Sequence, residues 1–181
     1  MRIAVYCGAH LGGDPAFQAA AVALGHWIVE QDYELVYGGS KLGLMGIIAD
    51  SVLEKGGTVM GVMPEFLQNR ERIHPRISQM ITVADMTERK KVMLAASDVC
   101  LALPGGVGTL EEISEAYSWA RIGQNDQPCI FFNVNHYYDP LQNFFDQMVE
   151  QAFLSKEDRA LALFSDSLST IARFIHEYYK K

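Results

Sequence analysis

The stretch Leu103 to Glu112, LPGGVGTLEE, compresses the end of a strand, a glycine turn and the start of a helix into ten residues. Gly105, Gly106 and Gly108 have no Cβ atoms that would keep a ligand away from the backbone. The helix that follows offers unpaired N–H groups and the positive end of its dipole. The stretch therefore predicts a site for an anion such as a phosphate group.

A simpler interpretation of the same stretch is a capping box. Thr109 is followed three residues later by Glu112, and two such side chains can satisfy the free donors at a helix start reciprocally. A cap, however, does not need three glycines, each of which costs conformational entropy when it is ordered. We therefore favour the anion site, with the capping box as the alternative.

Length and charge limit what the chain can be. Its 181 residues fit a single α/β domain, residues 1–181, large enough to bury a core without disulfides or metals. With 15 basic and 22 acidic residues the net charge is -7, which argues against nucleic acid or an anionic membrane as the main partner. The N-terminus enters an apolar strand without a signal-peptide pattern, so we expect a cytoplasmic protein.

Cysteines and histidines show no pattern of a metal site. The cysteines are far apart in the sequence, and none of the histidines has metal-ligand spacing. These residues are Cys7, Cys100, Cys129, His10, His26, His74, His136 and His176. We predict reduced, buried cysteines, no metal and no bound cofactor.

Short apolar runs alternate with segments of helical periodicity along the whole chain. Strands are expected at residues 2–7, 34–37, 58–63, 80–83, 99–103, 129–133 and 161–164, and helices at 15–30, 44–55, 85–96, 109–122, 140–151 and 168–179. A charged, irregular stretch at residues 65–76 is typical of a long loop or a short helix, and such loops often cover sites. The alternation predicts a Rossmann-like, doubly wound and mostly parallel sheet with helices on both faces.

In such a sheet, ligands bind beyond the carboxyl ends of the strands, where the strand order reverses. The loops that begin at Gly8, Gly38, Asp85 and Pro104 follow four of the expected strands. We expect these loops to converge at one edge of the sheet. The glycines and the pair Arg89-Lys90 are then neighbours in space.

These motifs resemble those of the LONELY GUY phosphoribohydrolases, once widely labelled lysine decarboxylases. Residues 104–112 are similar to the family's PGGxGTxxE signature, residues 86–90 to its MxxRK element, residues 38–46 to its GGGxxGLMG-type loop and residues 7–8 to the start of its CGSS loop. The resemblance covers nearly the whole chain. Several motifs in the family's order are a much more specific signal than one glycine loop.

The chain also departs from the family pattern. Ser40 replaces the third glycine of the second loop, and Ala9 and His10 stand where the family usually has two serines. Arg89 and Glu112 are both retained. The resemblance thus implies that the chemistry is kept, while the phosphate contacts and the substrate preference stay open.

The resemblance implies hydrolysis of the N-glycosidic bond of AMP or an N6-modified AMP, which gives the free base and ribose 5-phosphate. Loss of the base leaves an oxocarbenium-like ribosyl cation, so a carboxylate near the ribose can stabilise positive charge and orient water. We expect Glu112 to take that role. Arg89 is the second expected catalytic residue, either holding the phosphate or stabilising the departing base.

The resemblance also implies substrate contacts. The phosphate is expected at Gly105, Gly106, Gly108 and Thr109. Further substrate contacts are expected from Met86, Lys90, Gly39 and Ser40. Ordinary roles remain open for several neighbours, because Lys90, Glu111 and Glu115 are typical of solvated helix charges and Met86 of a core residue.

The resemblance implies a homodimer with active sites at the interface. The apolar residues of helix 109–122 offer a contact for the second chain, unless other helices of the same chain cover them.

A non-catalytic nucleotide or cofactor carrier of the same fold is the rival function. Retention of Arg89 and Glu112 favours the enzyme, since a carrier has no need of a carboxylate beside the ribose.

Overall fold

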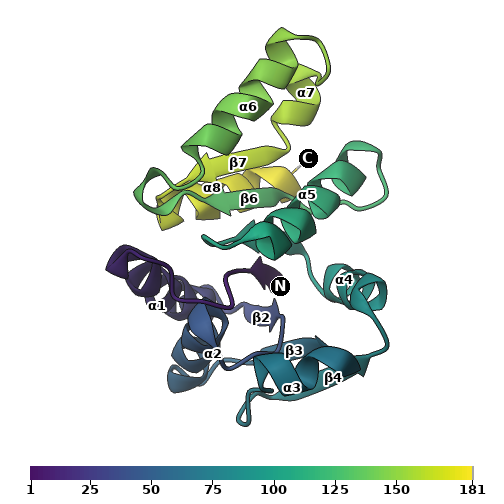
Figure 1. Cartoon of the computed structure of the whole chain (residues 1–181). Helices are drawn as coiled ribbons and strands as arrows, with labels where there is room; N and C mark the ends of the chain where they lie inside the picture. The colour runs from purple at the N-terminus through teal and green to yellow at the C-terminus, as the bar shows by residue number, and fades with distance from the viewer. Residues whose placement is uncertain (181) are drawn as a thin grey trace.

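The computed structural model (Figure 1) describes residues 1–180, with Asn69 and Arg70 described by their backbone alone. The strands are β1 (Arg2–Tyr6), β2 (Glu34–Tyr37), β3 (Val59–Pro64), β4 (Gln79–Val83), β5 (Val99–Ala102), β6 (Cys129–Phe132) and β7 (Ala162–Ser165). The helices are α1 (Pro15–Glu30), α2 (Gly43–Glu54), α3 (Gln68–Glu71), α4 (Met86–Ala95), α5 (Val107–Arg121), α6 (Asp139–Glu150), α7 (Lys156–Arg159) and α8 (Leu168–Tyr179), with 3-10 turns η1 (Glu65–Leu67) and η2 (Val134–His136).

The strands form one seven-stranded sheet in the order β4-β3-β2-β1-β5-β6-β7, and every pair in it is parallel. Helices α1, α2 and α8 pack on one face, and α4, α5 and α6 cover the other, as Figure 1 shows. The strand order reverses between β1 and β5. The predicted doubly wound α/β fold is confirmed, and its ligand-binding edge lies at the carboxyl ends of β1 and β5.

Burial on both faces explains the composition of the central strands. In β1, Ile3 and Val5 face the core under α1 and α2, whereas Ala4 and Tyr6 face the core under α4 and α5. Successive side chains of a strand point to opposite faces, so a strand covered on both sides is apolar throughout. This is why the strands appear in the sequence as continuous apolar runs.

Most predicted boundaries agree with the structure to within one or two residues. Helix α1 starts at Pro15, and the Asp14 side chain accepts a hydrogen bond from the Ala16 amide at 2.8 Å. Helix α3 lies in the stretch 65–76, where a long loop or a short helix was expected, and the short helix α7 was not predicted. Four-residue helices have too few positions to show an apolar period.

The capping-box interpretation of Thr109 and Glu112 is wrong. Helix α5 starts at Val107, two residues earlier than predicted, with Gly106 as its N-cap and no side-chain hydrogen bond at the cap. Thr109 therefore already lies in the first helical turn. From this position the Thr109 side chain cannot cap the helix. Capping therefore does not account for Thr109 and Glu112.

The expected contact surface of α5 also needs correction. Ile113, Ala116 and Tyr117 are buried against the sheet of their own chain. The exposed apolar residues of this region are Val107 and Leu110 at the start of the helix and Ile122 just after its end. An apolar stripe in a sequence does not reveal which of its members the sheet covers.

Among residues 1–180, none of the helices has both the length and the apolar character that a membrane span requires.

Gly43 allows the start of α2 to pack against the β1–α1 loop. Its φ is +58°, and a Cβ atom there would overlap the backbone of Ala9 and His10. Gly43→Ala combines left-handed strain of about 1–2 kcal/mol with a clash between two backbones. We expect it to lower the melting temperature by about 5 °C more than Gly56→Ala does.

Gly56 is the matched control, because its φ is +77° but nothing lies within 4 Å of a Cβ built there. Thermal unfolding of the two variants makes the comparison. Equal losses would show that close packing at Gly43 contributes nothing beyond backbone strain.

Candidate active site

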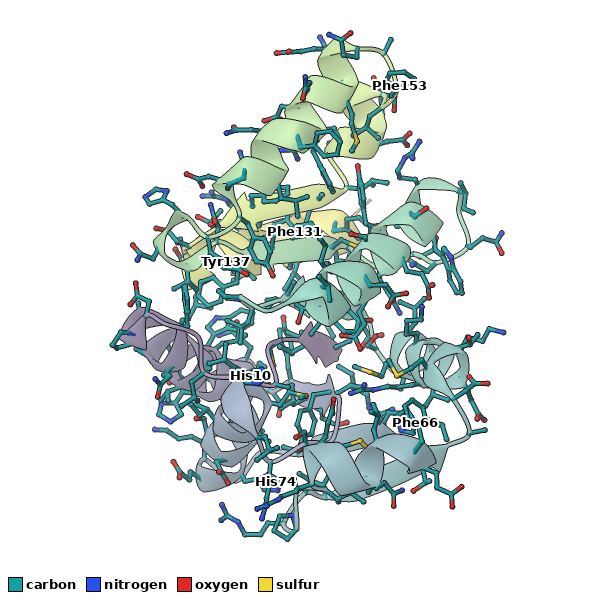
Figure 2. The ribbon with its side chains drawn as sticks, viewed as in Figure 1. His10, Phe66, His74, Phe131, Tyr137 and Phe153 are labelled. Atoms are coloured by element: carbon teal, nitrogen blue, oxygen red, sulfur yellow. The ribbon has the colours of Figure 1, made fainter. Side chains whose placement is uncertain are left out.

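A cavity of about 500 Å³ opens at the carboxyl ends of β1 and β5. Its walls come from the β1–α1 loop, the start of α2, the η1–α3 segment, α4 and the β5–α5 turn. His10 and Tyr137, both labelled in Figure 2, line it. The predicted convergence of these loops is confirmed, and the volume suits a small ligand such as a nucleotide.

The start of α5 forms one end of the cavity. The first hydrogen bond of this turn runs from the Leu110 amide to the Gly106 carbonyl at 3.1 Å, so the amides of Val107, Gly108 and Thr109 precede it. A Cβ atom on Gly105 would overlap the Thr109 side chain. Free amides, the helix dipole and close approach of the backbone together suit an anion.

The carbonyl groups before this helix are held by the protein. Tyr138 donates its hydroxyl proton to the Leu103 carbonyl at 2.7 Å, and Tyr137 donates to the Gly105 carbonyl at 2.6 Å. Between them, the Gly8 amide donates to the Pro104 carbonyl at 3.2 Å. Three successive carbonyl groups therefore already accept hydrogen bonds. These bonds fix the conformation of the turn and leave fewer free carbonyl oxygens that could repel an anion.

Arg89 of α4 is buried, with a side chain that is 6% exposed. Its Nε donates to the Val62 carbonyl and its Nη2 to the Gly38 carbonyl, both at 3.0 Å. Its Nη1 lies 4.0 Å from Oε1 of Glu112. The backbone just after β2 and within β3 therefore holds the guanidinium, and one edge of the group faces the cavity beside a carboxylate.

Glu112 lies one turn into α5, and its side chain is 11% exposed. Burial raises the pKa of its carboxyl group to about 7, and the charges of Glu111 and Glu71 act in the same direction. Arg89 and Lys90 oppose the rise in pKa. Near neutral pH the group can therefore hold or release a proton, as acid–base catalysis requires.

The structure brings some of the expected site residues together and leaves others outside. The cavity is lined by Arg89, Glu112, Met86, Gly105, Gly106, Gly108 and Thr109. Lys90 instead forms ion pairs with Glu111 and with Glu115, the latter at 2.8 Å. Gly39 and Ser40 lie behind the wall, where the buried Ser40 hydroxyl donates to the Glu71 carbonyl and accepts from the Leu42 amide at 3.1 Å.

Sequence reasoning missed two polar residues of the cavity, Glu71 and Tyr137. Glu71 lies in the irregular stretch that was expected to cover a site, so the signal was its location and not a motif. Tyr137 follows a turn with no recognisable pattern. Among the described residues, no three His, Cys, Asp or Glu side chains are grouped so that they could hold a metal ion.

The raised pKa of Glu112 has a consequence for stability. Folding raises this pKa to about 7, so the folded chain binds the proton more tightly than the unfolded chain. The resulting stabilisation is complete below the ordinary pKa of a glutamate and is lost as the pH rises to about 7. Glu112→Gln cannot ionise, and we expect its melting temperature to gain several degrees on wild type between about pH 5 and about pH 8.

Glu111→Gln is the matched control, because Glu111 is an exposed neighbour on the same helix. Glu111→Gln should show no gain in melting temperature at the higher pH, since it loses an ion pair with Lys90 and removes no buried charge. Thermal unfolding at both pH values measures the difference. A constant difference between wild type and Glu112→Gln would contradict the raised pKa.

Solved structures with a similar fold include proteins whose names describe different functions. The molybdenum cofactor carrier protein of Chlamydomonas reinhardtii matches with a TM-score of 0.72 and 18% identity over 99% of this chain and 98% of that chain. DNA processing protein A of Helicobacter pylori matches with a TM-score of 0.60 and 14% identity over 99% and 80%. At such identities the likeness concerns the fold alone.

Sequence comparison is more specific. A family model described as "Possible lysine decarboxylase" matches residues 45–175. Over 177 residues, the chain is 39% identical to the cytokinin riboside 5'-monophosphate phosphoribohydrolase LOG3 and 40% identical to LOG4, both of Arabidopsis thaliana, with 98% of this chain and 82% of each relative covered. The chain therefore belongs to the LONELY GUY family of cytokinin riboside 5'-monophosphate phosphoribohydrolases.

Proposed function

We propose that this chain hydrolyses the N-glycosidic bond of AMP or an N6-modified AMP to the free base and ribose 5-phosphate. One observation carries the proposal: Arg89 and Glu112 face each other at 4.0 Å in a cavity that ends at the open start of α5. Anion site, fixed cation and buried carboxylate are the groups that this reaction needs. The family to which the chain belongs supports the same assignment.

The order of groups along the cavity gives each a role. The 5'-phosphate lies against the amides of residues 105–109 at the start of α5. Glu112 is one turn further on, so it is next to the ribose and can stabilise positive charge at the anomeric carbon and orient the attacking water. Arg89 and Met86 then contact the base, where the guanidinium can stabilise the electron pair that leaves with it.

A carrier of the same fold is the rival function. A carrier requires only the phosphate end of the cavity. A buried carboxylate such as Glu112 repels an anionic ligand in the ground state and becomes favourable only when positive charge develops on the ribose. Its retention beside Arg89 favours catalysis over simple binding.

Product analysis tests the function. AMP and N6-isopentenyl-AMP are incubated with the protein beside adenosine and isopentenyladenosine, and the free base and ribose 5-phosphate are separated by chromatography. We expect turnover of the nucleotides and little of the nucleosides, because these lack the group that the start of α5 binds. Equal turnover of both would remove the phosphate role of the glycine turn, and tight binding without turnover would favour the carrier.

Two variants test the catalytic roles of Glu112 and Arg89. Glu112→Gln should lower kcat by at least about a hundredfold and leave nucleotide affinity within a few-fold, because it keeps the shape and removes the charge. Arg89→Lys keeps a positive charge but cannot reach both carbonyl groups, so it should also lose most activity. An active Glu112→Gln enzyme would contradict the assignment.

We further propose that the active form is a homodimer, in which the two chains contact each other beside the mouth of the cavity. Val107 is 87% exposed, and Leu110 and Tyr137 are exposed apolar residues near it. A second hollow, lined by Leu110 and Leu141 among others, adjoins the active cavity and shares with it Gly105, Gly106, Val107 and Tyr137. An apolar surface of this kind favours contact with a second copy.

Dilution tests the dimer. Light scattering and activity are measured over one concentration series, and we expect both mass and specific activity to fall together below the dissociation constant. Leu110→Glu should shift both transitions to higher concentration, because it places a charge in the contact. Lys156→Glu, on α7, is the control surface change. A fully active monomer would show that the site is complete within one chain.

A further inference from the structure

Tyr137, which is labelled in Figure 2, lies between the active cavity and the apolar hollow beside it, and it lines both. Its hydroxyl donates to the Gly105 carbonyl at 2.6 Å. Gly105 and Gly106 also line both hollows. The hydrogen bond from Tyr137 therefore acts on a peptide group at the phosphate end of the cavity.

The bond to Gly105 fixes the whole peptide group that joins Gly105 to Gly106. This peptide is trans, and in a planar trans peptide the C=O and the following N–H point in nearly opposite directions. Because the Gly105 oxygen is held on the side of Tyr137, the Gly106 N–H points away from that side. No described residue accepts a hydrogen bond from the Gly106 amide, so this donor is available to a ligand.

The turn that carries Tyr137 has a strained backbone. Asn135 and His136, directly before it, have φ values of +50° and +62°, both in the left-handed region. Two successive residues with side chains in this region are unfavourable, and they persist only where surrounding contacts determine the conformation. Strain of this kind is concentrated at functional sites.

Side-chain hydrogen bonds hold the strained turn on both sides. The Asn133 side chain accepts from the Tyr138 amide and donates to Asp139 at the start of α6, both at 2.6 Å. The Asn135 side chain donates at 2.6 Å to Asp14, the carboxylate that also caps α1. The turn is therefore tied to α6 and to the start of α1.

The ring of Tyr137 is also packed. The rings of Phe17 and Tyr138 contact it edge to face, with centroids 5.5 Å and 5.0 Å away. Gly12, with a φ of +78°, leaves room for Phe17, because a Cβ atom there would overlap the Phe17 ring. A ring held in this way delivers its hydroxyl to one place, so the bond to Gly105 is preorganised.

We infer that Tyr137 is a positioning residue for the 5'-phosphate, because its hold on the Gly105 carbonyl directs the Gly106 amide toward the phosphate. The inference rests on the proposed function, which supplies the phosphate. Tyr137 acts through the peptide group and does not touch the reacting atoms. Without its hydroxyl the peptide can rotate, which weakens the binding of ligands that carry the phosphate and spares ligands that lack it.

The test uses Tyr137→Phe, which removes the hydroxyl and keeps the ring and its packing. By calorimetry, affinity for ribose 5-phosphate should fall about fivefold, while affinity for adenine stays within about twofold. With AMP as substrate, KM should rise about fivefold and kcat should stay within about twofold. An unchanged affinity for ribose 5-phosphate, or an equal loss for both products, would overturn the inference.

Tyr138→Phe is the matched control. The Tyr138 hydroxyl donates to the Leu103 carbonyl at 2.7 Å, but the next residue is Pro104, whose nitrogen carries no hydrogen. Loss of this bond therefore releases no amide donor. Because Tyr138 is buried and Tyr137 is exposed, Tyr138→Phe should lower the melting temperature at least as much as Tyr137→Phe, yet reduce ribose 5-phosphate affinity less than twofold.

An equal loss of ribose 5-phosphate affinity in the two variants would show that the tyrosines only stabilise the turn, and it would overturn the inference. If Tyr138→Phe does not fold, Tyr117→Phe replaces it as the control. The Tyr117 hydroxyl also donates to a backbone carbonyl, that of Asp158 at 3.0 Å, away from the cavity. All variants are measured well above the dimer dissociation constant, so that assembly is the same in each.

The outcomes also separate this inference from the proposed function. A wild-type protein that binds ribose 5-phosphate but releases no base from AMP contradicts the proposed function, while the binding measurements still decide the role of Tyr137. A wild-type protein that hydrolyses AMP, beside a Tyr137→Phe enzyme with unchanged KM and ribose 5-phosphate affinity, contradicts only the inference.

Discussion

The buried guanidinium of Arg89 is the constraint on which the site depends. A charge out of water must be compensated, and here two carbonyl groups, those of Gly38 and Val62, accept hydrogen bonds from it. Gly38 directly follows β2, and Val62 lies within the neighbouring parallel strand β3, so the sheet fixes the spacing of the two carbonyls. The remaining edge of the group faces Glu112. Misplacing β2 or β3 would thus leave a buried charge unsatisfied and would also disturb the proposed catalytic pair, Arg89 and Glu112.

The sequence was sufficient to predict the parts of the structure that depend on local or periodic patterns. Alternating apolar runs and helical segments predicted the parallel sheet, and the positions of Gly8, Asp85 and Pro104 after strands predicted that their loops converge. The start of α5 was misplaced, because a Thr-x-x-Glu pattern looks like a cap whether or not a glycine already caps the helix. Only the structure shows that Gly106 does so.

Glu71 and Tyr137 could not be predicted, because long-range contacts alone bring them to the cavity. Glu71 is placed by Ser40, which lies 31 residues earlier, and Tyr137 by the Gly105 carbonyl, 32 residues earlier. Neither residue belongs to a repeating pattern. Gly39 and Ser40, in the glycine loop after β2, were expected to contact the nucleotide. In the structure the Gly38 carbonyl holds Arg89, and the Gly39 carbonyl and the Ser40 hydroxyl hold the segment of Glu71. Neither Gly39 nor Ser40 lines the cavity.

The same α/β sheet occurs in proteins whose names describe cofactor carriage and DNA processing, so the fold itself does not select hydrolysis. The selection comes from charge along the cavity. The start of α5 favours a phosphate, although the chain as a whole carries a net charge of -7. Burial raises the pKa of Glu112 because its negative charge lacks a full counter-charge in the resting site. In the proposed reaction, a ribosyl cation that forms beside Glu112 supplies that counter-charge. The desolvation that disfavours the ionised carboxylate at rest then makes Glu112 bind the transition state more strongly than the substrate.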